Sequence, residues 1–180
     1  VEWRRQVSPA TALTLTGGTQ VSDAADSFRD MQGGSLELGD VQNQQNVTAP
    51  FREDFAGVSI DYSGTRTSLN FGGRWTQEDY ADSVLAVFDR DVQQFSVNAS
   101  RRLGGSWMLS GFGSVNRRDY DDLGRQDDEL SIGASVTWQR PRTLEIELRF
   151  ERFELDSTEE DTEFEETRVY LGFRYIPEIG

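Results

Sequence analysis

The sequence contains no histidine, no cysteine and no lysine, so all 18 of its basic residues are arginine. The absence of histidine removes the commonest general base and the commonest metal ligand, and the absence of lysine removes an amine nucleophile. Without cysteine, no disulfide or thiol chemistry is available. These absences predict a protein that is not an enzyme and that carries no cofactor and no metal.

Long apolar runs are also missing. Hydrophobic residues make up 36% of the chain, which is low for a soluble core. No run approaches the ~20 apolar residues of a membrane-spanning helix. A β-barrel escapes that limit, because only every second residue of its strands must be apolar. The net charge of -14 argues against nucleic acid as a partner.

A regular alternation of apolar and polar residues dominates the stretch 130–155. Every second side chain is apolar in 130–138 and again in 144–150. A period of two places all the apolar side chains on one face of a strand and all the polar ones on the other. Between the two runs stands Pro141, which cannot continue a ladder of hydrogen bonds. The stretch therefore predicts a β-hairpin with one apolar face.

The same alternation recurs along the chain and predicts about eight antiparallel strands in a single domain, residues 1–180. Residues 1–9 are interpreted as a periplasmic lead-in, and residues 22–54 as a long extracellular loop. Phe112 breaks the alternation of its strand and is interpreted as a packed interior aromatic. The strands outside the central hairpin are predicted at 11–21, 55–62, 65–76, 94–101, 106–116 and 166–176.

Aromatic residues gather near the predicted strand ends, where amphipathic rings favour the two membrane interfaces. Short turns also alternate with long loops, which is typical of outer-membrane barrels with periplasmic turns and extracellular loops. These patterns predict an all-β fold, an antiparallel up-and-down transmembrane β-barrel in the outer membrane of a Gram-negative bacterium. The aromatic residues near the turns are Tyr62, Trp107, Trp138 and Tyr175, and those near the loops are Trp75, Tyr80, Tyr120 and Phe153.

A soluble up-and-down barrel of the lipocalin type has the same period, with its apolar residues facing inward around a ligand. Alternation alone does not say which face is inside. Large apolar residues occur on every predicted strand, more than a small barrel interior holds, and a soluble barrel has no need of aromatic girdles. We therefore favour the membrane barrel, with its apolar face toward lipid and lipopolysaccharide.

The polar face carries charged residues that would line the lumen. One interpretation is a selective pore or a binding cavity. The other is a network of ion pairs that fills a narrow barrel, and it is favoured for a closed barrel of about eight strands, which leaves no aqueous channel. A row of three glutamates on this face is read as a salt-bridge ladder in preference to a catalytic acid and base. The lumen-lining candidates are Asp61, Arg66, Arg74, Glu145, Glu147, Arg149, Glu151, Arg168 and Arg174.

Acidic residues cluster in two predicted loops, at 119–129 and 154–166. Oxygen-rich clusters can bind divalent cations, which are therefore candidate partners at these acidic loops. However, the spacing matches no known calcium-binding loop. A solvated, self-repelling surface is the favoured interpretation.

Three segments resemble bacterial outer-membrane β-barrel proteins that are encoded with exopolysaccharide export and PEP-CTERM sorting systems. Residues 3–11 (WRRQVSPAT) and 138–143 (WQRPRT) each lead into an alternating strand. Residues 169–175 (VYLGFRY) look like the C-terminal strand by which such barrels are recognised for assembly, although the chain continues beyond them to Gly180. Relatives of this kind tend to be longer, which implies the C-terminal part of a larger barrel.

The resemblance implies a porin-like channel or accessory protein in the export of polysaccharide or other solutes. The alternative is a sealed structural or adhesive barrel that displays acidic surface loops. A soluble, lipocalin-like ligand-binding barrel is the third hypothesis.

Overall fold

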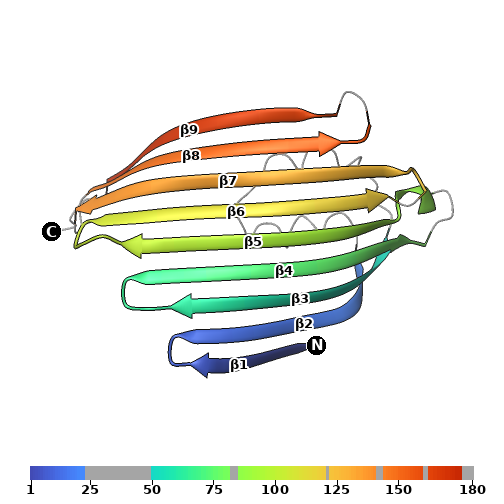
Figure 1. Ribbon diagram of the computed structural model, residues 1–180, viewed down its shortest axis with the longest axis horizontal. Coiled ribbons are helices and arrows are strands. Elements are labelled where there is room, and N and C mark those ends of the chain that lie inside the picture. Colours follow the sequence, from blue (N-terminus) through green and yellow to red (C-terminus); the bar gives the residue numbers. More distant parts are fainter. Residues whose placement is uncertain (23–49, 82–84, 121, 141–143, 160–161, 176–180) are drawn as a thin grey trace.

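The computed structural model of the protein describes residues 1–22, 50–81, 85–120, 122–140, 144–159 and 162–175. They form one sheet in which the strands lie in sequence order and every neighbouring pair is antiparallel (Figure 1). The predicted all-β, up-and-down architecture is therefore confirmed. None of the described helices is long and apolar enough to span a membrane. The elements are β1 (Glu2–Ser8), β2 (Thr11–Ser22), β3 (Phe51–Ser63), β4 (Thr67–Tyr80), the 3₁₀ turn η1 (Ala86–Phe88), β5 (Arg90–Arg102), β6 (Trp107–Tyr120), β7 (Arg125–Arg140), β8 (Leu144–Ser157) and β9 (Phe164–Tyr175).

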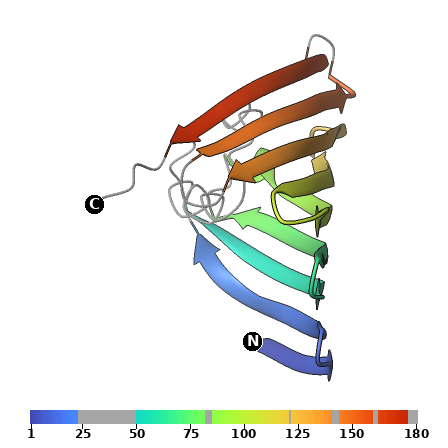
Figure 2. The same cartoon turned by 90° about the vertical axis from the view of Figure 1, so that its left-hand side faces the viewer.

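The sheet is curved, and β1 and β9 form its two edges (Figures 1 and 2). Within the described residues, β1 pairs only with β2 and β9 pairs only with β8. The nine strands are thus an open arc of barrel wall, where the sequence predicts about eight strands in this chain.

The additional strand is β1, which lies in the segment interpreted as a periplasmic lead-in. Most of residues 1–9 are therefore part of the sheet, and the lead-in interpretation is wrong for them. The register against β2 shifts between Gln6 and Ser8. Such a bulge interrupts the period of two. Arg5 also stands opposite Leu13, on the face where an apolar residue is expected. These two features hide the strand from pattern analysis.

The strands extend further toward the loops than the apolar alternation indicates. β6 continues to Tyr120 and β7 begins at Arg125, so most of the acidic segment predicted as a loop is paired strand. β3 begins at Phe51, inside the loop predicted at 22–54, and residues 23–49 of that loop lie outside the described part of the chain. In these extensions the backbone ladder and cross-strand charge pairs hold the strands together without an apolar face.

The register places the apolar rows of all strands on one side of the sheet. Residues that stand directly opposite each other share a face. One such row runs from Leu69 of β4 through Ala99, Gly111 and Ala134 to Phe150 of β8. The apolar face is therefore continuous across the sheet, because pairing repeats the same phase from one strand to the next.

This apolar face points outward and is exposed. Leu148 and Phe150 are 53% and 44% exposed. A soluble barrel would bury such residues around its centre, so their exposure agrees with the predicted outward orientation of the apolar face. Buried hydrophobic residues in the described chain are limited to Ala12, Phe51 and Leu155. Other large residues on the exposed face are Leu15, Val58, Ile60, Phe71, Trp75, Phe95, Val97, Leu109, Val115, Ile132, Val136, Val169, Leu171 and Phe173.

Toward the loops the outward face becomes charged. On β8 the outward residues beyond Phe150 are Arg152, Glu154 and Asp156. Arg152 forms ion pairs with Glu154 at 3.2 Å and with Glu165 at 3.1 Å. The apolar side chains therefore form a belt with a charged rim on the loop side, as expected for strands that cross a membrane.

The aromatic residues near the strand ends do not all face outward, as the predicted girdles require. Trp107 and Trp138 are paired on the outward face at the turn end of β6 and β7, as a girdle at one interface requires. Tyr80, Tyr120 and Phe153 face inward, because they stand in the opposite phase from the outward residues of their strands. The predicted loop-side girdle is therefore wrong for these three residues.

Phe112 faces inward, and its neighbour on the next strand explains it. Its ring lies over Gly133 of β7, where an added Cβ would come within 2.4 Å of the ring and 2.9 Å of the backbone oxygen of Phe150. An aromatic ring over a glycine covers backbone that a side chain would otherwise shield. Phe112 thus packs against a glycine of the next strand, as predicted for an interior aromatic. The pattern of a single strand does not reveal this partner.

We expect Gly133→Ala to lower the free energy of unfolding by about 1–3 kcal/mol, because Phe112 has to leave its position over the glycine. The measurement is urea unfolding of the protein refolded into lipid vesicles, followed by tryptophan fluorescence. Gly111→Ala is the matched control, because an added Cβ there meets only the backbone oxygen of Gly133, at 3.6 Å. Equal losses in the two variants would contradict this packing.

The apolar belt predicts a second effect on stability. Leu148→Arg places a charge at the centre of the outward apolar run of β8, and we expect it to cost about 2–4 kcal/mol in lipid. Asp156→Arg adds the same side chain on the same face of the same strand, beyond the belt, and should cost at most about 1 kcal/mol. The same unfolding measurement compares them, and a neutral Leu148→Arg would argue that this face does not contact lipid.

Candidate functional site

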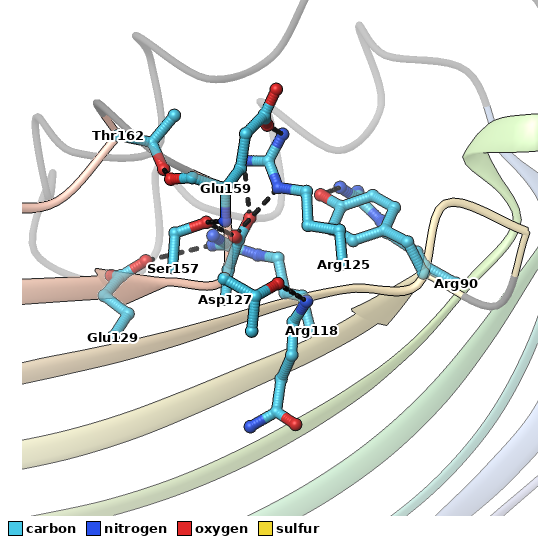
Figure 3. Close-up of polar contacts among 11 residues, drawn as sticks. Arg90, Arg118, Arg125, Asp127, Glu129, Ser157, Glu159 and Thr162 are labelled. Atoms are coloured by element: carbon cyan, nitrogen blue, oxygen red, sulfur yellow. Dashed lines mark hydrogen bonds and ion pairs between the residues drawn. The ribbon is translucent and has the colours of Figure 1, made fainter.

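The inward face is polar, and its loop end holds buried charges in pairs. The Arg118 guanidinium donates to Glu129 at 3.1 Å, and their side chains are only 9% and 6% exposed (Figure 3). Arg125 donates to both carboxylate oxygens of Asp127, at 2.9 and 2.7 Å, and Ser157 donates to the same carboxylate at 2.6 Å. Burial of these charges is tolerated because each guanidinium meets a carboxylate in good geometry.

Tyr120 lies between two arginines of this region. The Cζ atoms of Arg90 and Arg125 lie 5.8 and 5.3 Å from the centroid of its ring. Arg90 also donates to Glu78 at 2.7 Å and to the Tyr120 hydroxyl at 3.2 Å, and Arg125 reaches Glu159 at 2.6 Å. Guanidinium groups over an aromatic face add cation–π attraction to the ion pairs. These contacts connect β4 through β8 at the loop end of the wall.

A smaller group of contacts continues the charged region across β2, β3 and β4. The carboxylate of Glu53 accepts from Arg74 at 2.5 Å and from Gln20 at 2.8 Å. Arg74 also donates to Thr76 at 3.2 Å and lies over the ring of Phe55, with its Cζ 4.6 Å from the centroid. We call the whole region the loop-end charge cluster, which comprises Glu53, Arg74, Glu78, Arg90, Arg118, Arg125, Asp127 and Glu129.

Between this cluster and the turns, the inward face consists mainly of small, uncharged polar residues. One row joins serines on five successive strands and ends on β8: Ser63, Ser68, Ser100, Ser110, Ser135 and Arg149. The adjacent row contains Asp61, Asn70, Asn98, Phe112 and Gly133. Short side chains leave space above the sheet, and residues of these two rows line an open hollow of about 410 Å³, here called the mid-wall hollow.

Eight of the nine lumen-lining candidates lie on the inward face of their strands, and one does not. The exception is Arg66, which lies in the turn before β4 begins at Thr67 and is not part of the strand wall. Its strand was predicted from residue 65, two residues too early. The eight inward residues are Asp61, Arg74, Glu145, Glu147, Arg149, Glu151, Arg168 and Arg174.

The candidates on β8 and β9 form lateral pairs. Arg149 contacts Glu151 at 2.9 Å, and Arg168 donates to Glu166 at 2.7 Å. Glu145 stands directly opposite Arg174 in the register. These placements favour the salt-bridge ladder over an acid and base pair. In the described part of the chain, no group of three or more acidic residues is arranged to hold a metal ion.

Most of the loop-end charge cluster escaped the sequence prediction, because its residues fall in segments interpreted as loops. A signal was nevertheless present around the connection between Tyr120 and Arg125. The arginines at 117 and 118 and the aspartates at 127 and 128 stand at equal distances from it, and the register pairs Arg118 with Asp127 and Arg117 with Asp128. Opposite charges placed symmetrically about a turn indicate a hairpin that continues past its apolar region.

Comparisons with known proteins agree with this geometry. Residues 92–175, from within β5 to the end of β9, match the family model described as "Putative beta-barrel porin 2". The chain is similar in structure to outer-membrane expressed OmpT of Vibrio cholerae, with a TM-score of 0.63 at 12% identity, covering 92% of this chain and 52% of OmpT. The in-vitro folded trimer form of OmpT matches with a TM-score of 0.63 at 11% identity, covering 94% of this chain and 53% of OmpT. The loop L8 deletion mutant of OmpT matches with a TM-score of 0.61 at 14% identity, covering 92% of this chain and 49% of the mutant. No curated protein matches the chain.

The chain therefore has the fold of an outer-membrane β-barrel, and it spans about half the length of the solved structures that it matches. The family match and this fold support the predicted location in the outer membrane. The fold agrees with the exposed apolar belt, which needs a lipid environment.

The buried pair predicts a third effect on stability. Glu129→Ala removes the carboxylate that Arg118 contacts, and we expect a loss of about 3–5 kcal/mol in the free energy of unfolding. Asp128→Ala breaks the pair with Arg117 on the outward face of the same two strands, where the side chains are 37% and 49% exposed. That control should cost at most about 1 kcal/mol. Unfolding in lipid vesicles measures both, and similar losses would contradict the role assigned to burial.

Proposed function

We propose that this chain forms part of the wall of an outer-membrane channel for hydrophilic solutes. The carrying observation is an open, nine-stranded arc whose inward face is polar. A barrel of about eight strands is filled by its own side chains, whereas barrels of about 16–18 strands leave an aqueous channel. The matched structures are about twice as long as this chain. If further strands completed the barrel between β1 and β9, it would belong to the class that is wide enough for an aqueous channel.

The arrangement of the charges supports an open lumen. Each described inward ion pair links residues of the same strand or of neighbouring segments, such as Arg149 with Glu151 and Arg118 with Glu129. These charges are neutralised along the wall and need no partner from across the barrel. The network favoured by the sequence is therefore present, but it does not require a filled interior.

We propose polysaccharide, or another hydrophilic solute, as the cargo that passes through the channel. The resemblance of 3–11 and 138–143 to barrels encoded with exopolysaccharide export and PEP-CTERM systems supports this choice. In the structure, residues 3–11 comprise most of β1, its turn and the first residue of β2, and residues 138–140 are the end of β7.

We expect the complete natural polypeptide to form conducting channels when it is inserted into planar lipid bilayers. Arg149→Glu should shift the reversal potential in a salt gradient toward cation selectivity, because it reverses an inward charge. Arg152→Glu is the matched control, since it reverses a charge on the outward face of the same strand and should leave selectivity unchanged. A complete polypeptide that inserts without any conductance would refute the channel.

A further inference from the structure

We propose that the mid-wall hollow is a binding site for a neutral, polyhydroxylated solute, with the chemistry of a sugar unit. The proposal rests on the channel function in that a solute must reach this wall from the lumen. The first supporting observation is size. The hollow measures about 410 Å³, which is within the range of about 300–1,000 Å³ for sites of small ligands.

The second observation is the hydrogen-bonding capacity of the lining. Asn70 donates to Asp61 at 2.7 Å, and Asn98 donates to Asn70 at 3.4 Å. In the serine row, the hydroxyls of Ser68 and Ser100 lie 2.7 Å apart. Each amide has two N–H donors and a carbonyl with two lone pairs, and each hydroxyl has one donor and two lone pairs. The rows are thus oriented by these bonds and still have capacity for a ligand that both donates and accepts, as hydroxyl groups do.

The third observation is the charge of the hollow. Its lining contains one acidic and one basic residue, Asp61 and Arg149, on strands at opposite ends of the rows. Asp61 accepts from Asn70, and Arg149 contacts Glu151 at 2.9 Å. The lining itself has no net charge, so it offers no electrostatic preference for an ion. This chemistry favours a neutral ligand, in contrast to the arginine-rich loop-end charge cluster.

The fourth observation is the apolar surface supplied by Phe112. Its ring lines the hollow among hydroxyls and amides, where it lies over Gly133, and the Arg149 Cζ is 5.8 Å from its centroid. A sugar ring has hydroxyl groups around its edge and C–H groups on its faces. Such a ligand would place a C–H face against the aromatic ring while its edge bonds to the rows, and so would use both kinds of surface.

The test is binding of maltotriose, a neutral sugar, to the complete polypeptide in detergent, measured by a saturation-transfer NMR titration. We expect saturable binding, with a dissociation constant raised about threefold to tenfold by Asn98→Ala, which removes hydrogen bonds to the ligand. Phe112→Leu should raise it as well, because a branched side chain still covers Gly133 but presents no flat ring. Ser114→Ala is the control, one inward position along β6 from Phe112 and outside the lining, and should leave binding unchanged.

Circular dichroism of each variant confirms that a change in binding does not reflect unfolding. Absence of saturable binding by the folded wild type would overturn the proposal, as would equal binding by all variants. Preference for glucuronate, an anionic sugar, over maltotriose would overturn the neutral class. Because binding is measured without a bilayer, its loss is distinguishable from loss of conductance. Binding without conductance would support the hollow and refute the channel.

Discussion

The constraint on which this structure depends is that backbone polar groups within a lipid bilayer have no water to bond. Every N–H and C=O at that depth must find its partner inside the protein. The chain meets this constraint with antiparallel ladders of about a dozen residue pairs between successive strands from β2 to β9, and with a shorter ladder between β1 and β2. A ladder satisfies the backbone whatever the side chains are, which frees the two faces of the sheet for different purposes.

The same constraint applies to the edges of the sheet. An open edge does not occur in contact with lipid, because its backbone groups would remain unsatisfied. Within the described residues, β1 and β9 each have one paired side. Closure therefore requires that the open sides of β1 and β9 be paired, and the width of the finished barrel decides whether its polar face surrounds water. This is why the question of channel or sealed barrel is one of strand number more than of side-chain chemistry.

The sequence predicted the fold class and the direction of each face well, because the period of two depends on residues of a single strand. The run from Leu144 to Phe150 was enough to identify its strand, and the exposure of Leu148 agrees with the predicted outward face. The features that were missed depend on contacts between strands. The bulge near Ser8 concealed β1, the pairing of Phe112 with Gly133 requires the register, and Arg118 and Asp127 stand beyond the apolar belt where no alternation of hydropathy exists.

The candidate site shows the same division. Individual inward residues such as Arg74, Arg149 and Arg168 were found, since their phase along a strand is sufficient. The rows to which these residues belong were not predicted, because each row is formed by residues of five or more strands that are far apart in the sequence.

The lateral pairing of charges links stability to function. A soluble domain is stabilised by an apolar core, yet the described residues bury only Ala12, Phe51 and Leu155 among their hydrophobic side chains. The stabilising apolar contacts of this sheet must therefore be made with lipid on its outward face. On the inward face, carboxylates and guanidinium groups satisfy each other along the wall, as Arg125 and Asp127 do. None of these contacts needs side chains that cross the interior, so a solute can occupy the space in front of the serine row.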